Sequence, residues 1–281
     1  MNKVVIFGVG STGKRVYEKI KNHVQVLYFT DNNEKRWGEK EGDIPIKSVS
    51  ELHKKEFDLI YIASLPGLNA IYKQLINEYH ISADSIIRNE VELPIIARNR
   101  FLEQFSEHVN SFNIDGNVCE VGVFQGDFAK EINAFFPERK FFLFDTFEGF
   151  NESDISVERE RGFSTMDIGH LSMTSVEMVL EKLPYPKMCT IKKGYFPDTF
   201  DLDKETFCFV NLDIDLYKPT KDGLDIFWPR LEAGGVILVH DYFNSHYPGV
   251  KVAVDEFSHS QNVCLMPIGD GFSIALQKQL H

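Results

Sequence analysis

The sequence of 281 residues is poor in basic residues and has no long apolar run. Thirty Lys and Arg stand against 42 Asp and Glu, so the net charge is −12. Nucleic acids and anionic membranes attract basic surfaces, so neither is expected as a partner. No apolar run approaches the roughly 20 residues of a membrane span. Met1 to Phe7 lead into a glycine and not into a signal-peptide cleavage site, which predicts a first strand.

Cysteine is scarce as well. The four cysteines are Cys119, Cys189, Cys208 and Cys264, and they lie far apart, so CxxC-type zinc and redox motifs are absent. At least three lie in apolar, strand-like runs, which is typical of buried free thiols in a reducing compartment. Together with the lack of a signal peptide, this predicts a cytoplasmic protein. Apolar residues make up 43% of the chain, enough for a core without disulfides or metals.

The first 92 residues predict a small α/β domain of Rossmann type. The strand-like run Val4–Phe7 is followed by Gly8-Val-Gly-Ser-Thr-Gly13, which opens a helical pattern. This is the GxGxxG spacing between a strand and a helix, as dinucleotide sites require. Asp31 follows the next strand, about where an acid would bind a ribose hydroxyl.

Two interpretations of this domain stay open. It binds NAD or another nucleotide at Gly8–Gly13, or the glycines serve the turn geometry alone and the domain binds nothing. The pattern FGxGxxG followed by DNN at 31–33 resembles the N-terminal Rossmann-like domains of bacterial polysaccharide-biosynthesis enzymes. Pro94 predicts the domain boundary, which gives domains 1–92 and 93–281. Residues 95–112 are then expected to form a helix, because their apolar side chains recur every three or four positions.

The second domain carries a stronger sequence signal for a glycine turn. The run Asn117–Gly126, N-V-C-E-V-G-V-F-Q-G, predicts a buried strand that enters a turn and then a helix from Asp127. The next strand ends at Asp145. Ligands bind at the carboxyl ends of the strands in an open parallel sheet, where an acid can hold both hydroxyls of a ribose. Glu120 and Asp145 are therefore candidate cofactor residues.

Polar residues also end two later strands. Asp213 follows the strand that begins at Phe207, and His240 and Asp241 follow the strand that begins at Val236. A crossover helix between these strands places their carboxyl ends at one edge of the sheet. Two carboxylates meeting there suit a divalent cation with oxygen ligands, usually magnesium. Asp215 lies two residues after Asp213 and would share its strand face.

These residues reveal a family resemblance. The segments EVGVFQG at 120–126 and FDTFEGF at 144–150 resemble class I S-adenosylmethionine-dependent methyltransferases. More narrowly, the chain resembles the macrocin/mycinamicin O-methyltransferases, which methylate sugar hydroxyls. Further collinear segments carry this match: GYFPDT at 194–199, NLDIDLYKPT at 211–220, GGVILVHDY at 234–242 and PGVKVAVDEF at 248–257. The match covers about residues 115 to 277.

The resemblance implies an α/β fold of two Rossmann-like units, the second a class I methyltransferase sheet closed by an antiparallel hairpin around 269–271. It implies that S-adenosylmethionine is bound by Glu120, Gly122, Val123, Gly126, Asp145, Thr146 and Phe147. It also implies that Asp213, His240 and Asp241 are the catalytic residues and ligate a divalent metal, Mg²⁺ or Mn²⁺.

His240 departs from the family pattern, which has an aspartate at this position. Imidazole favours softer or transition metals over magnesium. His240 is therefore a metal ligand, a general base with an ordinary pKa near 6.5, or a residue that only orients the substrate. The charged segment 151–171 is expected to be a long loop, either a lid over the site or a solvated surface loop.

The sequence thus favours transfer of a methyl group to a sugar hydroxyl, with metal assistance, in bacterial surface polysaccharide (capsule or lipopolysaccharide) or glycosylated-metabolite biosynthesis. The acceptor is a small-molecule sugar or a nucleotide-linked sugar, and a homo-oligomer is expected. The alternatives are an NAD-dependent sugar-nucleotide oxidoreductase or epimerase that uses the N-terminal GxGxxG, and a binding protein in which both folds are scaffolds. No Tyr-x-x-x-Lys dyad occurs in the first half, which disfavours the oxidoreductase.

Overall fold

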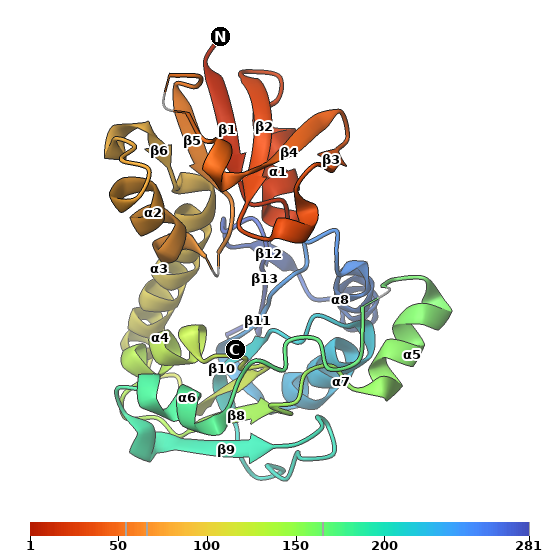
Figure 1. The fold of residues 1–281 in the computed structure, drawn as a ribbon. Coiled ribbons are helices and arrows are strands. Elements are labelled where there is room, and N and C mark those ends of the chain that lie inside the picture. The colour runs from red at the N-terminus through yellow and green to blue at the C-terminus, as the bar shows by residue number, and fades with distance from the viewer. Residues whose placement is uncertain (54, 66, 165, 281) are drawn as a thin grey trace. The chain divides into compact units, whose positions relative to one another are not determined.

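The computed structural model describes residues 1–53, 55–65, 67–164 and 166–280, and it divides into two compact units, Met1–Ile96 and Ala97–His281. Each unit contains its own mainly parallel sheet with helices, as Figure 1 shows. The predicted α/β fold with two Rossmann-like units is confirmed. Among the described residues, no helix has both the length and the apolar character needed to cross a membrane.

The sheet of the first unit has the order β3-β4-β2-β1-β5-β6, and only the β3–β4 pair is antiparallel. Its elements are β1 (Lys3–Phe7), α1 (Ser11–Ile20), β2 (Gln25–Asp31), β3 (Lys40–Glu41), β4 (Ile44–Ser48), β5 (Leu59–Ile62), α2 (Leu68–Asn77) and β6 (Ile86–Ile87). Successive side chains of β1 point to opposite faces. Ile6 packs with Val16 of α1, while Val5 and Phe7 pack in the cluster that contains Leu75 of α2.

Packing explains two of the three glycines in the 8–13 turn. A Cβ on Gly13 would lie 2.1 Å from the carbonyl oxygen of Gly8, and one on Gly8 would lie 2.6 Å from that of Ala63. A Cβ on Gly10 would meet nothing within 4 Å. The Asp31 carboxylate accepts hydrogen bonds from the backbone N–H groups of Val9 (3.0 Å) and Asn33 (2.8 Å). The fold itself therefore accounts for Gly8, Gly13 and Asp31, but not for Gly10.

The helix predicted to start after Pro94 begins earlier. Helix α3 spans Asn89–Ser111 and contains Pro94 in its second turn. A proline at that position removes one backbone hydrogen bond but leaves the rest of the helix intact. The expectation that Pro94 ends local structure was wrong, because Leu102 and Phe105 farther along the helix are buried and stabilise it.

The second unit has a seven-stranded sheet with the order β12-β13-β11-β10-β7-β8-β9. Its remaining elements are β7 (Asn117–Val121), α4 (Asp127–Phe135), β8 (Phe141–Asp145), α5 (Glu152–Arg161), α6 (Val176–Lys182), β9 (Cys189–Lys193), β10 (Phe207–Leu212), α7 (Tyr217–Phe227), β11 (Leu231–Val239), α8 (Pro248–Gln261), β12 (Leu265–Pro267) and β13 (Ile274–Gln277). β13 runs antiparallel to β11 and to β12, which confirms the closing hairpin.

Both faces of this sheet are covered by helices. One core contains Phe105 of α3 and Ile132 of α4, and the other contains Phe227 of α7 and Val254 of α8. Along the chain the sheet grows from β7 through β8 to β9, then continues on the other side with β10 and β11. The strand order therefore reverses between β7 and β10, and ligands bind at such a point, outside the carboxyl ends of the strands.

The segment 151–171 is not a continuous loop, because helix α5 occupies residues 152–161. Local signals for this helix are present in the sequence. Asn151 caps its first turn by accepting from the N–H of Ser153 (2.9 Å), and Gly162 ends it in the left-handed conformation. The buried carboxylate of Glu158 accepts from the N–H of Tyr217 (2.7 Å) in the first turn of α7. A negative charge at a helix N-terminus is favourable, so this contact fixes α5 on α7.

The glycine turn of the first unit gives a test of packing. We expect Gly13→Ala to destabilise the protein by about 2–3 kcal/mol, because the new Cβ would overlap the Gly8 carbonyl. Gly10→Ala should cost less than about 1 kcal/mol, since its Cβ would be unobstructed and only the weak capping preference is lost. Urea denaturation of both variants measures the difference, and equal losses would contradict the assignment.

Candidate active site

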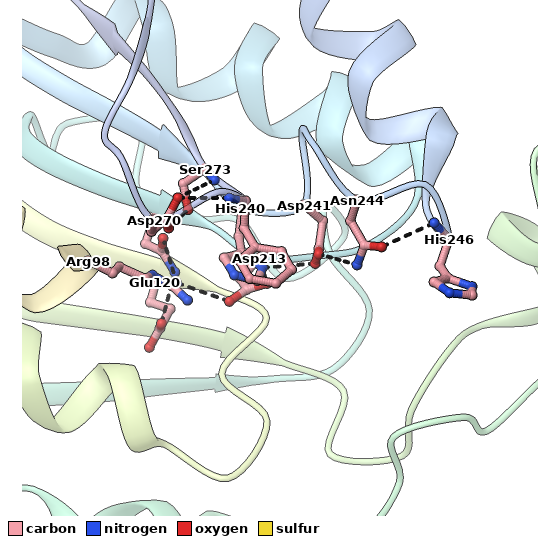
Figure 2. Close-up of polar contacts among 11 residues, drawn as sticks. Arg98, Glu120, Asp213, His240, Asp241, Asn244, His246, Asp270 and Ser273 are labelled. Atoms are coloured by element: carbon pink, nitrogen blue, oxygen red, sulfur yellow. Dashed lines mark hydrogen bonds and ion pairs between the residues drawn. The ribbon is translucent and has the colours of Figure 1, made fainter. Parts of the chain in front are cut away.

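Asp213, His240 and Asp241 meet at the carboxyl ends of β10 and β11. Nδ1 of His240 lies 3.1 Å from a carboxylate oxygen of Asp213 and 2.9 Å from one of Asp241. The other oxygen of Asp241 accepts from Nδ2 of Asn244 (2.6 Å), as Figure 2 shows. The ring of Phe272 stacks on His240. One ligand atom from each of the three predicted residues lies within 4.8 Å of the others. The structure therefore brings the three predicted catalytic residues together.

Opposite charges in this cluster shift the pKa values of its members toward their charged forms. Burial lowers the pKa of His240, but the carboxylates of Asp213 and Asp241 outweigh it and raise that pKa to about 10. Burial raises the pKa of each aspartate, yet the nearby imidazolium holds both pKa values below the usual range. Without a metal, His240 is therefore protonated at neutral pH. It can accept a proton from a substrate only after it has lost its own.

Asp215 does not share a strand face with Asp213, because β10 ends at Leu212 before either residue. The backbone of Asp215 is left-handed, with φ of 64°, and turns its carboxyl group toward Asp241. Burial and the charge of Asp241 raise the pKa of Asp215 well above its usual value. The neutral carboxyl group then donates a hydrogen bond to Asp241, which is a supporting role.

Arg98 of α3 also belongs to the site, although no sequence motif indicated it. Its Nη2 donates to Oδ2 of Asp213 (3.0 Å) and to Oδ1 of Asn211 (3.2 Å). Its guanidinium carbon lies 3.7 Å from the ring centroid of Phe128, near the start of α4. Arg98 is one of several polar residues on a long helix, so only the tertiary structure distinguishes it.

Glu120 lies on β7, beside Asn211 of β10. It is 1% exposed, and its Oε1 accepts from Nδ2 of Asn211 (2.9 Å). Its Oε2 is buried and has no hydrogen-bond partner among the described residues. Burial raises the pKa of Glu120 well above its usual value, an effect that Arg98 and Asn211 reduce. A cationic or hydrogen-bonding ligand group at Oε2 would satisfy this carboxyl group.

The predicted cofactor turn is held by Asp145. One carboxylate oxygen accepts from the N–H groups of Val123 (2.7 Å) and Phe124 (2.8 Å), and the other accepts from Phe147 (2.7 Å). Gly122 has a φ of 83°, and a Cβ there would lie 2.0 Å from the carbonyl oxygen of Asp213. The turn after β7 is thus pressed against the end of β10.

The other predicted cofactor residues lie around this turn. Gly126 is the N-cap of α4, with a φ of 78°, and a Cβ on it would lie 3.1 Å from the side chain of Val179 in α6. The hydroxyl of Thr146 donates to the carbonyl of Gly149 (2.9 Å) and shapes the loop after β8. The ring of Phe147 is buried in the core, so its backbone is the part that lies beside Asp145.

The donor set of the cluster fits a divalent metal. Two carboxylates and one imidazole offer ligand atoms at mutual distances that a single ion can span. The nitrogen ligand favours Mn²⁺ or another transition metal more than Mg²⁺. A metal would replace the proton on His240 and would bind the oxygen of Asp213 that Arg98 does not contact. Among the described residues, no other set of His, Cys, Asp and Glu side chains gathers in this way.

Two family models match the chain. Residues 88–270 match the family model described as macrocin O-methyltransferase. The chain belongs to the macrocin O-methyltransferase family. Residues 1–87 match a second model, described as C2185-like, N-terminal. The predicted resemblance to the macrocin family is therefore confirmed over most of the second unit.

One curated relative is similar in sequence, and two solved structures share the fold. Demethyldecarbamoylnovobiocin O-methyltransferase of Streptomyces niveus is 26% identical over 175 residues, which are 58% of this chain and 65% of the relative. The chain thus spans less than two thirds of that curated relative. The O-methyltransferase NovP shares the fold with a TM-score of 0.54 at 21% identity, covering 75% of this chain and 94% of NovP. Calicheamicin methyltransferase CalS11 gives 0.53 at 19% identity, covering 75% and 91%.

The imidazolium of His240 predicts how stability depends on pH without metal. Its folded pKa of about 10 exceeds the unfolded value near 6.5, so its stabilisation is complete below about pH 6.5 and is lost as the pH rises through about 10. In EDTA, His240→Gln should cost several kcal/mol near pH 6 and much less near pH 10. Urea denaturation at both pH values measures this, with the exposed His259→Gln as control. A loss independent of pH would show that His240 is not charged.

Proposed function

We propose that this chain transfers the methyl group of S-adenosylmethionine to a sugar hydroxyl. The observation that carries the proposal is the cluster of Asp213, His240 and Asp241 next to Glu120, at the point where the strand order reverses. Membership of the macrocin O-methyltransferase family supports it. So does the curated relative, which by its name methylates demethyldecarbamoylnovobiocin.

The fold supplies a place for the cofactor. We assign its binding to Glu120, Gly122, Val123, Gly126, Asp145, Thr146 and Phe147. The Gly122 turn brings the backbone close to the ligand, and Asp145 keeps lone pairs for ribose hydroxyls in addition to the backbone bonds that it accepts. The methyl group of a sulfonium is already activated, so these residues need only hold it in line with the acceptor oxygen.

The acceptor hydroxyl would lie at the cluster. A metal held by Asp213, His240 and Asp241 would supply a positive charge that orients a hydroxyl and lowers its pKa. Asn244 fixes one oxygen of Asp241, and Arg98 fixes one oxygen of Asp213, so both carboxylates keep a defined direction. His240 can accept a proton only in its neutral, metal-free form, because an imidazole that ligates a metal through one nitrogen carries a proton on the other. As a metal ligand, it would therefore leave proton removal to another base.

A surface pocket of about 400 Å³ adjoins this edge. Its lining includes Arg159 and Phe163 from the α5 region and His246 after β11. The N–H of His246 donates to Asn244 (3.1 Å), which in turn donates to Asp241. We assign this pocket to the part of the acceptor beyond the methylated sugar, and Arg159 suits the phosphate of a nucleotide-linked sugar. Surface polysaccharide and glycosylated metabolites both supply such acceptors.

The first unit leaves a second candidate function, an NAD-dependent oxidoreductase or epimerase. One observation favours a ligand there: Gly10 is the glycine of the 8–13 turn that internal packing does not require. All four cysteines are free thiols, which supports a reducing cytoplasm as the site of action for either function.

Ligand-induced stabilisation separates the two functions. We expect S-adenosylhomocysteine to raise the melting temperature, because a ligand that binds only the folded state at 100 times its Kd adds about 2.7 kcal/mol. NAD is the matched comparison in the same differential scanning experiment. Stabilisation by NAD alone would overturn the methyltransferase proposal.

Asp213→Asn tests the catalytic edge. The substitution removes a charge from the cluster, so methyl transfer should fall at least about 100-fold while the affinity for S-adenosylhomocysteine changes little. Transfer is measured by mass spectrometry, as a gain of one methylene mass on a panel of nucleotide-linked hexoses and heptoses. Asp225→Asn, an exposed change on α7, is the control. Full activity of Asp213→Asn would remove this residue from the mechanism, and full activity in EDTA would exclude a metal.

A further inference from the structure

A surface pocket of about 530 Å³ in the first unit has a basic lining. Lys3, Lys47 and Lys55 line it together with Tyr28 and Glu56. These residues come from β1, β2 and β4 and from the segment before β5, and the strands lie side by side in the order β4-β2-β1-β5 (Figure 1). Three cations at one pocket contrast with the net charge of −12 of the whole chain. A pocket of this size accommodates a small molecule.

The pocket is separate from the Gly8–Gly13 turn. Lys3 is the first residue of β1, whereas Gly8 follows the last residue of that strand. Lys55 and Glu56 precede β5, which runs parallel to β1. These two strands therefore meet the pocket near their amino ends, while the glycine turn lies at the carboxyl end of β1. A ligand in the pocket would not occupy the position of a dinucleotide in a Rossmann-type domain.

Tyr28 gives the pocket a buried polar group. The residue is 2% exposed, and its hydroxyl oxygen has no hydrogen-bond partner among the described residues. Burial, followed by the charges of Glu56 and Glu51, raises the pKa of Tyr28 to about 12, so the hydroxyl keeps its proton at neutral pH. A buried hydroxyl without a partner is unfavourable for the folded protein. An acceptor atom of a ligand would satisfy it.

The lysines of the pocket are not neutralised by the protein. In the part of the chain that the structure describes, Nζ of Lys3, Lys47 and Lys55 forms no ion pair, whereas Lys14 of the same unit pairs with Glu41 (3.0 Å). Ammonium groups without acidic partners repel one another at short range. They are therefore available to an anion, which would remove this repulsion.

We propose that this pocket binds a small ligand with a phosphate group and hydroxyl groups, a phosphorylated sugar. A phosphate monoester carries nearly two negative charges at neutral pH, which suits the three ammonium groups of Lys3, Lys47 and Lys55. Tyr28 donates its hydroxyl proton to the ligand. Glu56 accepts from a hydroxyl of the sugar, and its charge disfavours ligands that are anionic throughout.

Lys47 connects the anion with the buried hydroxyl. Its Nζ lies 4.5 Å from the centroid of the Tyr28 ring, so the ammonium group covers a face of that ring. The backbone of Lys47 is fixed in β4, where its carbonyl accepts from the hydroxyl of Thr30 (3.1 Å), but its four-carbon side chain is flexible. A phosphate draws the ammonium group off the ring, because a charge-assisted hydrogen bond is stronger than a partly exposed cation–π contact. The ligand then takes its place beside Tyr28.

Calorimetric titration of the full chain tests the pocket with glucose 1-phosphate and glucose 6-phosphate at about 150 mM salt, where weak surface attraction is screened. At least one of them should bind. Tyr28→Phe and Lys47→Met should each weaken that binding by about 10-fold, the loss of one charge-assisted bond. Inorganic phosphate should bind more weakly because it offers no sugar hydroxyl to Glu56, and glucose should not bind because it has no charge for the lysines.

Matched variants separate this pocket from other effects. Lys73→Met removes an exposed lysine on α2 and should leave the affinity unchanged. Arg159→Met removes the cation of the pocket in the second unit and should also leave it unchanged. Tyr28→Phe should keep or raise the melting temperature of the protein without ligand, since the hydroxyl has no partner to lose. A loss of affinity in a variant that is equally stable is then a loss of binding.

Several results would overturn the proposal. Binding of neither sugar phosphate, or equal affinities in the wild type, Tyr28→Phe and Lys47→Met, would show that the pocket is not a phosphate site. A loss confined to Arg159→Met would place the ligand in the second unit. Equal affinities for inorganic phosphate and the sugar phosphates would remove the sugar from the assignment. Since no methyl transfer is measured, each of these results leaves the proposed function of the second unit standing.

Discussion

The arrangement of the candidate site depends on the burial of several carboxyl groups at one edge of the second unit's sheet. Glu120, Asp145, Asp213, Asp215 and Asp241 all lie at or just beyond the carboxyl ends of β7, β8, β10 and β11. Like charges this close in a region of low dielectric would repel strongly. The structure offsets them with Arg98, the imidazolium of His240, backbone N–H groups on Asp145, and a proton on Asp215. Each of these interactions also fixes the direction of a side chain.

This balance is consistent with the proposed chemistry. A donor with a sulfonium and an ammonium group, and a divalent metal, would bring positive charge to an edge built mainly of acids. In the metal-free protein, Arg98 and His240 take the place of that charge on Asp213 and Asp241. Histidine at position 240 gives the metal-free cluster a positive charge between two carboxylates, and it would still offer a nitrogen to the proposed metal.

Sequence patterns predicted the sheet and most of the site because they depend on neighbours along the chain. A strand that ends in an acid or a glycine turn is local information, and it located Glu120, Gly122, Asp145, Asp213, His240 and Asp241. Helix α5 is also encoded locally, by Asn151, its acidic first turn and Gly162, although the high charge of the segment favours a loop. Pro94 does not end the helix, since the tertiary packing of Leu102 and Phe105 stabilises α3 through it.

By itself, the sequence determined the two α/β units, the order of strand ends and the family, since each follows from periodicity and motifs in contiguous segments. Only the tertiary structure decided that Arg98 joins the site, that Asp215 turns toward Asp241, and that His240 lies between two carboxylates. These contacts join residues from α3, β10 and β11 that are distant in the chain. Their energies depend on distance, burial and neighbouring charge, and none of these quantities can be obtained from the local sequence pattern.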